Sequence, residues 1–297
     1  MRRSGVALLL LALLIVADIV LVTGALRSTH VDTSKYAQAA PAPSGDVTDT
    51  PAPATATATA ASAGTRPRAS RVVVAGLTST RAWRAITHVS ACSDGARHAT
   101  IGHTEDAGKR WTTVKVPLVT VSGLSYANGA VVATGLDTSC EPTTYALTAN
   151  SAPGKTSSSA GWVIDPSDPT ELETSGQPVA EQPCADGLRD VATNSGSDVV
   201  ALCANGAVEH TTDTGATWNE LSKSDGVSAI ATGTDSVYVA GSSACGISVR
   251  SVDANTTGCV DGTAKWSGPI DITVVGGTLW LVSDTAAITV PVSSLDS

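Results

Sequence analysis

Residues 228–241 read SAIATGTDSVYVAG, which is an apolar alternation, a turn rich in Gly, Thr and Asp, and a second alternation. The pattern recurs in GLSYANGAVVATG at 123–135, DVATNSGSDVVAL at 190–202 and DITVVGGTLWLVS at 271–283. A weaker copy, VVVAGLTSTRAWRAITHVS, occupies 72–90. Period-two alternation on both sides of a Gly, Asn or Asp turn is typical of a β-hairpin. The sequence therefore predicts five hairpin units.

Tryptophan marks a second regularity, at residues 111, 162, 218 and 266, which are 51, 56 and 48 residues apart. A repeat near fifty residues is the length of one four-stranded propeller blade. The absence of Phe and the abundance of Gly, Ala, Val, Ser and Thr favour small β-packed layers. We therefore expect an all-β fold over residues 71–297, a β-propeller of about five four-stranded blades whose last blade lacks its fourth strand.

Two of these tryptophans end a sharper motif, TEDAGKRW at 104–111 and TTDTGATW at 211–218, both fitting [ST]-x-D-x-G-x-x-W. The Asp carboxylate can accept hydrogen bonds from the N–H groups of its own turn, and Gly supplies a positive φ. The Trp ring can then be buried between neighbouring units. The residues expected to hold these turns are Thr104, Asp106, Gly108, Trp111, Thr211, Asp213, Gly215 and Trp218.

This motif resembles the Asp-box, or BNR repeat, of the sialidase-like β-propellers. The resemblance covers roughly residues 72–292 and implies that each box is a structural turn between the third and fourth strands of a blade, without a catalytic role. Trp162 and Trp266 depart from the motif because no Asp stands at the box position before the first and a longer loop precedes the second. We expect degenerate blades there, and a ring closed by a strand from one terminus, with the residues after Ser70 as candidates.

The resemblance raises the alternative of a glycosidase, since sialidases use an arginine triad, a Tyr nucleophile with a Glu, and an Asp acid/base. Residues 71–297 contain seven Arg and three Tyr, none of the Arg in an Arg-Ile-Pro context. Tyr126 and Tyr238 fall at strand positions and are expected to pack. We therefore predict no catalytic residue. A sialidase-like or other glycoside hydrolase remains the alternative. A deep central pocket with converging carboxylates would favour it, whereas a filled or shallow centre and an apolar patch would favour a scaffold.

All six cysteines follow residue 71, and an even number in an exported domain predicts disulfides. Six cysteines allow fifteen pairings. We prefer Cys245–Cys259 and Cys184–Cys203, because each would close a short loop within one repeat. Cys92–Cys140 is then the remaining pair.

The N-terminus indicates the location of the chain. Arg2 and Arg3 precede the apolar run GVALLLLALLIVADIVLVTGAL at 5–26, which as a helix is long enough to cross a bilayer. We expect a cytoplasmic end at 1–4, a signal anchor at 5–26 and an Ala/Pro/Thr-rich disordered linker at 27–70. The domain that follows would lie outside the cytoplasm. A cleaved signal peptide and a secreted protein are the alternative.

The charge of the outer domain and its motifs narrow the choice of ligand. The chain has a net charge of −9, and residues 71–297 alone carry −11, which argues against nucleic acid as a partner. No metal-ligand spacing occurs, and His98 and His103 are too oddly spaced for a pair on one strand face. We expect no cofactor, with calcium on acidic loops left open. The favoured function is a membrane-anchored binding or scaffold protein whose propeller face recognises a protein or a glycan of a bacterial cell envelope.

Overall fold

The computed structural model describes residues 71–88, 98–127, 129–157, 161–174, 177–253 and 257–295. The expected anchor at 5–26, the linker at 27–70 and Cys92 lie outside these residues. Within them no helix is long and apolar enough to span a membrane.

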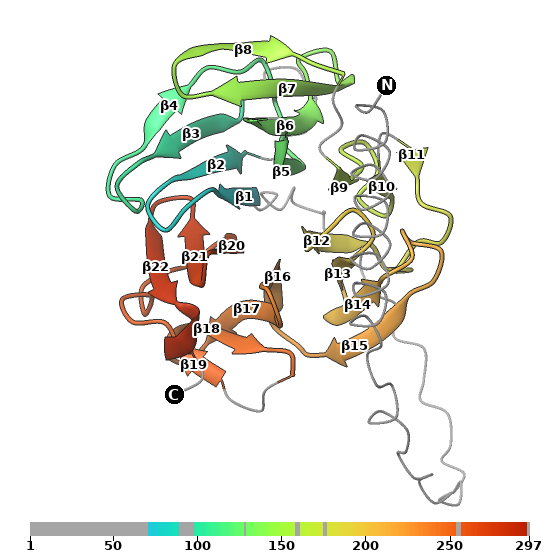
Figure 1. Cartoon of the computed structure of the whole chain (residues 1–297), viewed down its shortest axis with the longest axis vertical. Coiled ribbons are helices and arrows are strands. Elements are labelled where there is room, and N and C mark those ends of the chain that lie inside the picture. Colours follow the sequence, from blue (N-terminus) through green and yellow to red (C-terminus); the bar gives the residue numbers. More distant parts are fainter. Residues whose placement is uncertain are drawn as a thin grey trace, which may run out of the picture. The chain divides into compact units, whose positions relative to one another are not determined.

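The described strands form six antiparallel sheets arranged as the blades of a β-propeller (Figure 1). Blade 1 contains β1 (Arg71–Gly76), β2 (Ala82–Thr87), β3 (Thr100–Thr104) and β4 (Thr112–Val114). Blade 2 contains β5 (Gly123–Ala127), β6 (Ala130–Leu136), β7 (Pro142–Thr148) and β8 (Ser151–Lys155). Blade 3 is short, with β9 (Trp162–Ile164), β10 (Leu172–Thr174) and β11 (Gln177–Pro178).

The second half of the ring repeats this order. Blade 4 contains β12 (Leu188–Thr193), β13 (Val199–Cys203), β14 (Ala207–Thr211) and β15 (Asn219–Lys223). Blade 5 contains β16 (Val227–Thr232), β17 (Val237–Ser243), β18 (Gly246–Ser251) and β19 (Thr257–Cys259). Blade 6 contains β20 (Ile270–Val275), β21 (Thr278–Ser283) and β22 (Ala287–Pro291), followed by a 3-10 turn, η2 (Val292–Ser294).

The expectation of about five blades is therefore wrong, since there are six, and the missed one is blade 3. All five expected hairpins form, each from the first two strands of a blade. Trp111 and Trp218 directly precede the fourth strands of their blades, but Trp162 opens the inner strand β9 and Trp266 lies between β19 and β20. The four regularly spaced tryptophans therefore occupy positions that are not equivalent among the blades. Their spacing gave no sign of blade 3, whose strands have only two or three residues.

Strand order fixes two faces of the ring. In every blade the first strand is an edge strand at the centre, and the chain then moves outward. Turns between first and second strands, and between third and fourth, consequently lie on one face, while the other connections lie opposite. We call the first the hairpin face; its turns include 77–81, 194–198, 233–236 and 276–277, together with both box turns.

The ring closes by side-by-side packing of blades 6 and 1. β1 pairs with β2 within its own blade and lies beside β20, so the described residues exchange no strand between the two ends. This corrects the expectation that residues after Ser70 would complete the last blade. Blade 6 has three described strands, as expected. Trp280 Nε1 donates to the Thr78 carbonyl at 2.9 Å across this junction.

The hydrophobic core is divided among the blade interfaces. One buried cluster joins blades 6 and 1 around Trp280, which is fully buried. Others join blades 1 and 2, 3 and 4, 4 and 5, and 5 and 6. Small β-branched residues and Ala dominate them, which explains how the chain packs without Phe.

Two of the three expected disulfides form, Cys184–Cys203 and Cys245–Cys259. The first ties the connection before blade 4 to the end of β13, and the second lies within blade 5. The third pair includes Cys92, which is outside the described residues, so it stays a prediction. Two disulfides indicate an oxidising compartment outside the cytoplasm.

Candidate functional site

Both box motifs form turns between the third and fourth strands of their blades. In blade 1, Thr104 Oγ1 donates to Asp106 Oδ1 at 2.9 Å and accepts from Gly108 N at 3.1 Å. The Asp106 carboxylate in turn accepts from Arg110 N and Arg110 Nε, both at 2.9 Å. The hydrogen bonds to Arg110 lower the pKa of Asp106 to about 2.

The blade 4 turn repeats this arrangement. Thr211 Oγ1 donates to Asp213 Oδ1 at 2.8 Å and accepts from Gly215 N at 3.0 Å. Thr217 replaces the arginine, donating from N at 2.9 Å and from Oγ1 at 2.7 Å to the Asp213 carboxylate. These hydrogen bonds lower the pKa of Asp213 to about 2. A carboxylate whose oxygens accept hydrogen bonds from its own turn has the structural role of stabilising that turn.

Each box also packs against the preceding blade. Trp111 joins the cluster between blades 1 and 6, where the Arg84 guanidinium lies 4.3 Å from its ring centroid. Trp218 stands edge-on to Trp162 of blade 3, with ring centroids 6.2 Å apart, and donates to the Glu181 carbonyl at 2.9 Å. The structure therefore brings the eight expected box residues together as two inter-blade supports.

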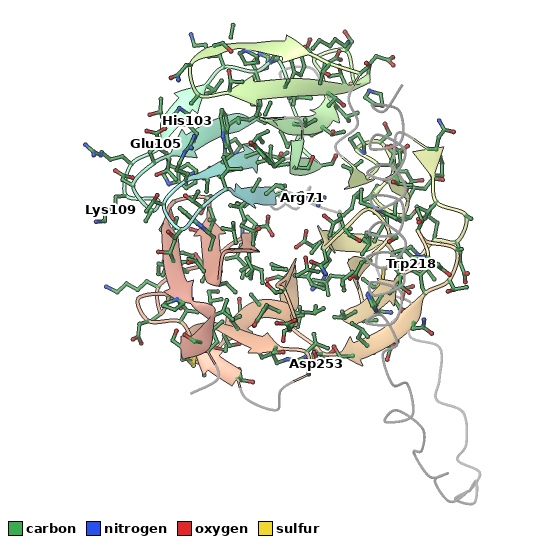
Figure 2. The ribbon with its side chains drawn as sticks, in the orientation of Figure 1. Arg71, His103, Glu105, Lys109, Trp218 and Asp253 are labelled. Carbon is green, nitrogen blue, oxygen red and sulfur yellow. A yellow bond between two sulfur atoms is a disulfide. The ribbon has the colours of Figure 1, made fainter. Side chains whose placement is uncertain are left out.

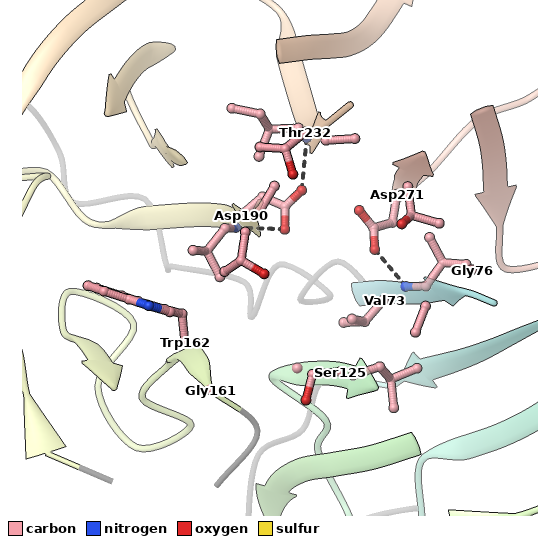
Figure 3. Close-up of a pocket in the computed structure, with 18 of the residues that line it drawn as sticks. Val73, Gly76, Ser125, Gly161, Trp162, Asp190, Thr232 and Asp271 are labelled. Atoms are coloured by element: carbon pink, nitrogen blue, oxygen red, sulfur yellow. Dashed lines mark hydrogen bonds between the residues drawn. The ribbon is translucent and has the colours of Figure 1, made fainter. Parts of the chain in front are cut away.

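A cavity of about 460 Å³ occupies the centre of the ring (Figure 3). All six inner strands or the residues beside them line it, and its polar lining includes Ser125, Thr193 and Thr232. Figure 3 shows Asp190 and Asp271 on facing sides of this cavity. Neither residue is among those expected from the sequence. The signal was present, since Asp190 and Asp271 open two of the quoted hairpin copies at the same position.

Each of these two aspartates joins two blades. Asp190 accepts from Ile230 N on β16 at 2.9 Å and from Val191 N at 2.9 Å. Asp271 accepts from Val74 N on β1 at 2.6 Å and from Ile272 N at 2.8 Å. All four carboxylate oxygens therefore accept backbone N–H groups of inner edge strands, which have no neighbouring strand on the side facing the cavity.

The two carboxyl groups also perturb each other. Burial, reinforced by the negative charge of Asp190, holds the pKa of Asp271 well above its usual range. Burial likewise raises the pKa of Asp190, while the positive charge of Arg71 opposes that rise. Arg71 lies toward the centre of the ring (Figure 2). The pair therefore retains a proton at a pH where ordinary carboxyls have lost theirs.

A second cavity, of about 550 Å³, lies beside the central one between blades 1 and 2. We call it the blade 1–2 groove. Residues at the hairpin-face ends of β1, β2, β5 and β7 line it, and Gly76 and Tyr126 line both cavities. The groove residues used below are Leu77, Thr78, Arg81, Trp83, Tyr126, Val131, Leu147, Thr148 and Asn150.

Tyr126 corrects the expectation that both strand tyrosines would pack. Tyr238 is buried, but Tyr126 is 61% exposed. Alternating side chains of an inner strand point to the two faces of its sheet. Tyr126, however, is near the end of β5, where the strand reaches the mouth of the cavity. Tyr126 therefore presents its ring to solvent between the two cavities.

The remaining expected site elements do not converge. The described arginines occupy six separate places, and no three His, Cys, Asp or Glu side chains in the described ranges gather as a metal site. His103 packs beside Trp83, with ring centroids 5.1 Å apart, and His98 precedes β3. Arg71 lies toward the centre of the ring, Arg81 lines the groove, and Arg84 lies over the Trp111 ring. Arg110 pairs with Asp106 of the box, Arg189 donates to the Val227 carbonyl, and Arg250 donates to Ser224.

Comparisons with known proteins add little to this geometry. No family model matches the sequence, and no curated protein matches it. A protein of unknown function from Bacteroides thetaiotaomicron VPI-5482 is 12% identical, with 75% of this chain and 69% of that chain covered and a TM-score of 0.46. A chain of a nidogen/laminin complex is 10% identical, with 76% and 90% covered and a TM-score of 0.46.

A third similar structure is the GH74 enzyme of Niastella koreensis, 15% identical, with 74% of this chain and 36% of that chain covered and a TM-score of 0.38. At such values these likenesses support no statement about activity or ligand. The propeller assignment rests on the six sheets described above.

Proposed function

We propose that this chain is a non-catalytic binding protein of the cell envelope, anchored by residues 5–26, whose hairpin face recognises a glycan. The exposed Tyr126 ring between two cavities carries this proposal. An aromatic ring gives a flat apolar platform on which the face of a sugar ring can lie, and cavities of this size are typical of small-ligand sites. Hydroxyl-bearing side chains at the cavity mouth supply hydrogen-bonding partners for a polyol.

A glycan is favoured over a protein partner by the character of the exposed surface. Among the described residues, Tyr126 and Leu221, 61% and 41% exposed, are the large hydrophobic side chains on the surface. They belong to the inner strand of blade 2 and the outer strand of blade 4, and so form no common patch. Stable protein interfaces usually have a more apolar centre with aromatic anchors.

The central carboxyl pair favours a glycoside hydrolase as the second candidate. A central cavity with two carboxyls of raised pKa is what an enzyme of this fold would need. One argument weighs against it: all four carboxylate oxygens already accept backbone N–H groups.

The box turns support an origin within the sialidase-like propellers. Their Thr–Asp–Gly hydrogen bonding is the same in blades 1 and 4, and each box Trp contacts the preceding blade. We propose this kinship on the motif and its geometry alone.

Binding of the full-length chain in detergent micelles to an array of envelope glycans tests the function. We expect at least one glycan to bind wild type, and Tyr126→Ala to weaken that binding about tenfold, through loss of ring contact. Leu221→Ala, which removes the other large hydrophobic side chain exposed among the described residues, serves as the matched control and should bind as wild type does.

Two results would contradict the proposal. Failure of every glycan on the array to bind correctly folded protein would remove the glycan from consideration and leave a protein partner. Release of reducing ends from a bound glycan, lost in Asp190→Asn, would establish the hydrolase instead.

A further inference from the structure

We propose that the blade 1–2 groove is a subsite for an N-acetylated hexosamine unit. The inference rests on the proposed glycan-binding function and adds the chemistry of the sugar and the place where it binds. Three features of the groove carry it: apolar side chains beside an exposed aromatic ring, donors that hydrogen-bond to none of the described residues, and the positive sign of the charge in its lining.

The groove has a mixed lining, to which three apolar side chains contribute. Trp83, Val131 and Leu147 line the groove and belong to the buried core between blades 1 and 2. Tyr126 stands at the rim with its ring largely exposed. A pyranose ring can lie against Tyr126. An acetamido group offers both a methyl for the apolar part of this lining and a carbonyl for its polar part.

The groove also contains donors that none of the described residues engages. Within the part of the chain that the structure describes, neither the Arg81 guanidinium nor the Trp83 indole N–H makes a hydrogen bond or ion pair. By contrast, the indoles of Trp162, Trp218 and Trp280 each donate to a backbone carbonyl at 2.9 Å. An acetamido carbonyl is an acceptor of the kind that these free donors require. Thr78, Thr148 and Asn150 at the rim can bind ring hydroxyls.

Charge distinguishes the acetylated sugar from the free amine. Arg81 is the charged residue among those that line the groove, and the lining contains no Asp or Glu. An ammonium group would meet a like charge there and find no carboxylate. The domain as a whole nevertheless carries −11 between residues 71 and 297, so nonspecific attraction would favour the amine. The positive charge in the groove therefore favours the acetylated sugar, whereas the negative net charge of the domain favours the free amine.

Titration of the full-length chain in micelles with N,N′,N″-triacetylchitotriose, chitotriose and maltotriose separates these cases. Trp83 lines the groove, so tryptophan fluorescence can report binding alongside calorimetry. We expect the acetylated trimer to bind, and chitotriose and maltotriose to bind at least about tenfold more weakly. The preference should persist at raised salt, because it depends on contacts in the groove.

Variants then locate the site. Tyr126→Ala should raise the dissociation constant about tenfold, and Arg81→Ala about three- to tenfold. Arg81→Glu places a carboxylate in the groove and should reverse the preference toward chitotriose. Lys109→Ala, which removes an exposed cation from the blade 1 box turn, is the control and should leave all affinities unchanged. Unchanged circular dichroism and Tm would show that each variant is folded.

The outcomes separate the two proposals. If a glycan binds but prefers no acetamido group, or if Arg81→Glu keeps the wild-type preference, the groove assignment is wrong while the glycan-binding function stands. Tighter binding of chitotriose by wild type would overturn the inference in favour of net charge. If no saccharide binds at all, the function itself fails.

Discussion

Gly108 and Gly215 show how one residue can set the approach of two blades. Gly108 has φ of 81° in its box turn, and a Cβ there would lie 2.6 Å from Ala287 Cβ of blade 6. In the blade 4 box, a Cβ on Gly215 would lie 3.0 Å from the Trp162 ring. The glycine of the motif therefore serves two purposes, because it allows the left-handed turn and it lets the preceding blade come close.

Gly108→Ala should consequently destabilise the protein more than the backbone conformation alone requires. A left-handed alanine costs about 1–2 kcal/mol, and overpacking against Ala287 adds about 1–3 kcal/mol. Gly129 has the same φ of 81° with nothing within 4 Å of its added Cβ, so Gly129→Ala isolates the backbone contribution. Urea unfolding of both variants measures the difference, and equal losses of stability would contradict the close-packing role.

The position of a single residue was predictable where a motif requires a specific hydrogen-bonding partner for it. It was not predictable where the question was whether the side chain is buried or exposed to solvent. Thr104, Asp106 and Gly108 could be placed because a carboxylate, a hydroxyl and a positive φ must meet within one turn. Tyr126 could not, since the alternation of an inner strand does not indicate which residue stands at the cavity mouth. Asp190 and Asp271 have backbone partners on other blades, 40 and 197 residues away in the sequence, which no local pattern reveals.

At the scale of elements, the two disulfides differ in how deeply their cysteines are buried. Cys184 and Cys203 are 19 residues apart and both buried, whereas Cys245 and Cys259 are 14 apart and Cys259 is exposed. Loops of this length predict similar stabilisation through the unfolded chain, about 3 kcal/mol each. The buried pair also fills space in the core between blades 3 and 4.

Replacing both cysteines of a bridge by Ala should therefore separate the two contributions. We expect Cys245→Ala with Cys259→Ala to cost about 3 kcal/mol, and Cys184→Ala with Cys203→Ala to cost more, because a cavity is added to the lost cross-link. Guanidinium unfolding of each double variant gives the comparison. A smaller loss for the buried pair would show that blade 3 and its connection contribute little to the stability of the ring.

The elements themselves show why the hairpins were predictable and the blade count was not. A hairpin is a local structure, and its alternation and turn residues are read directly from sequence. Blade 3 has strands of three, three and two residues, too short for alternation to stand out. Ring closure is likewise not local, because β1 and β20 meet only in the folded molecule.

At the scale of the whole molecule, different carboxyl groups affect the stability of the fold in different parts of the pH range. The box aspartates have pKa values lowered to about 2, so they stabilise the fold above the ordinary Asp pKa of about 3.9, and this contribution is lost as the pH falls through about 2. Asp271 behaves oppositely because its pKa is raised in the folded state. Its contribution is complete below about pH 4 and is lost as the pH rises through the folded pKa.

Stability should therefore be greatest in mildly acidic solution and decline toward neutral pH as the ring loses the proton held by Asp190 and Asp271. Each unit by which the folded pKa exceeds the unfolded value lowers the Tm by about 3–5 °C over this range. Asp271→Asn keeps the size of the side chain and removes its ionisation, so its Tm should stay nearly level from about pH 5 to about pH 8.

Differential scanning calorimetry across this range measures the effect, with Asp235→Asn, an exposed carboxylate on the hairpin face, as the control that should keep the wild-type slope. The reason for the difference is geometric. Asp271 accepts from Val74 N where blade 6 meets blade 1, so repulsion from a charged Asp190 acts on the junction that closes the ring. A wild-type Tm that stays level, or an Asp271→Asn protein that retains the wild-type decline, would show that the carboxyl pair does not govern closure.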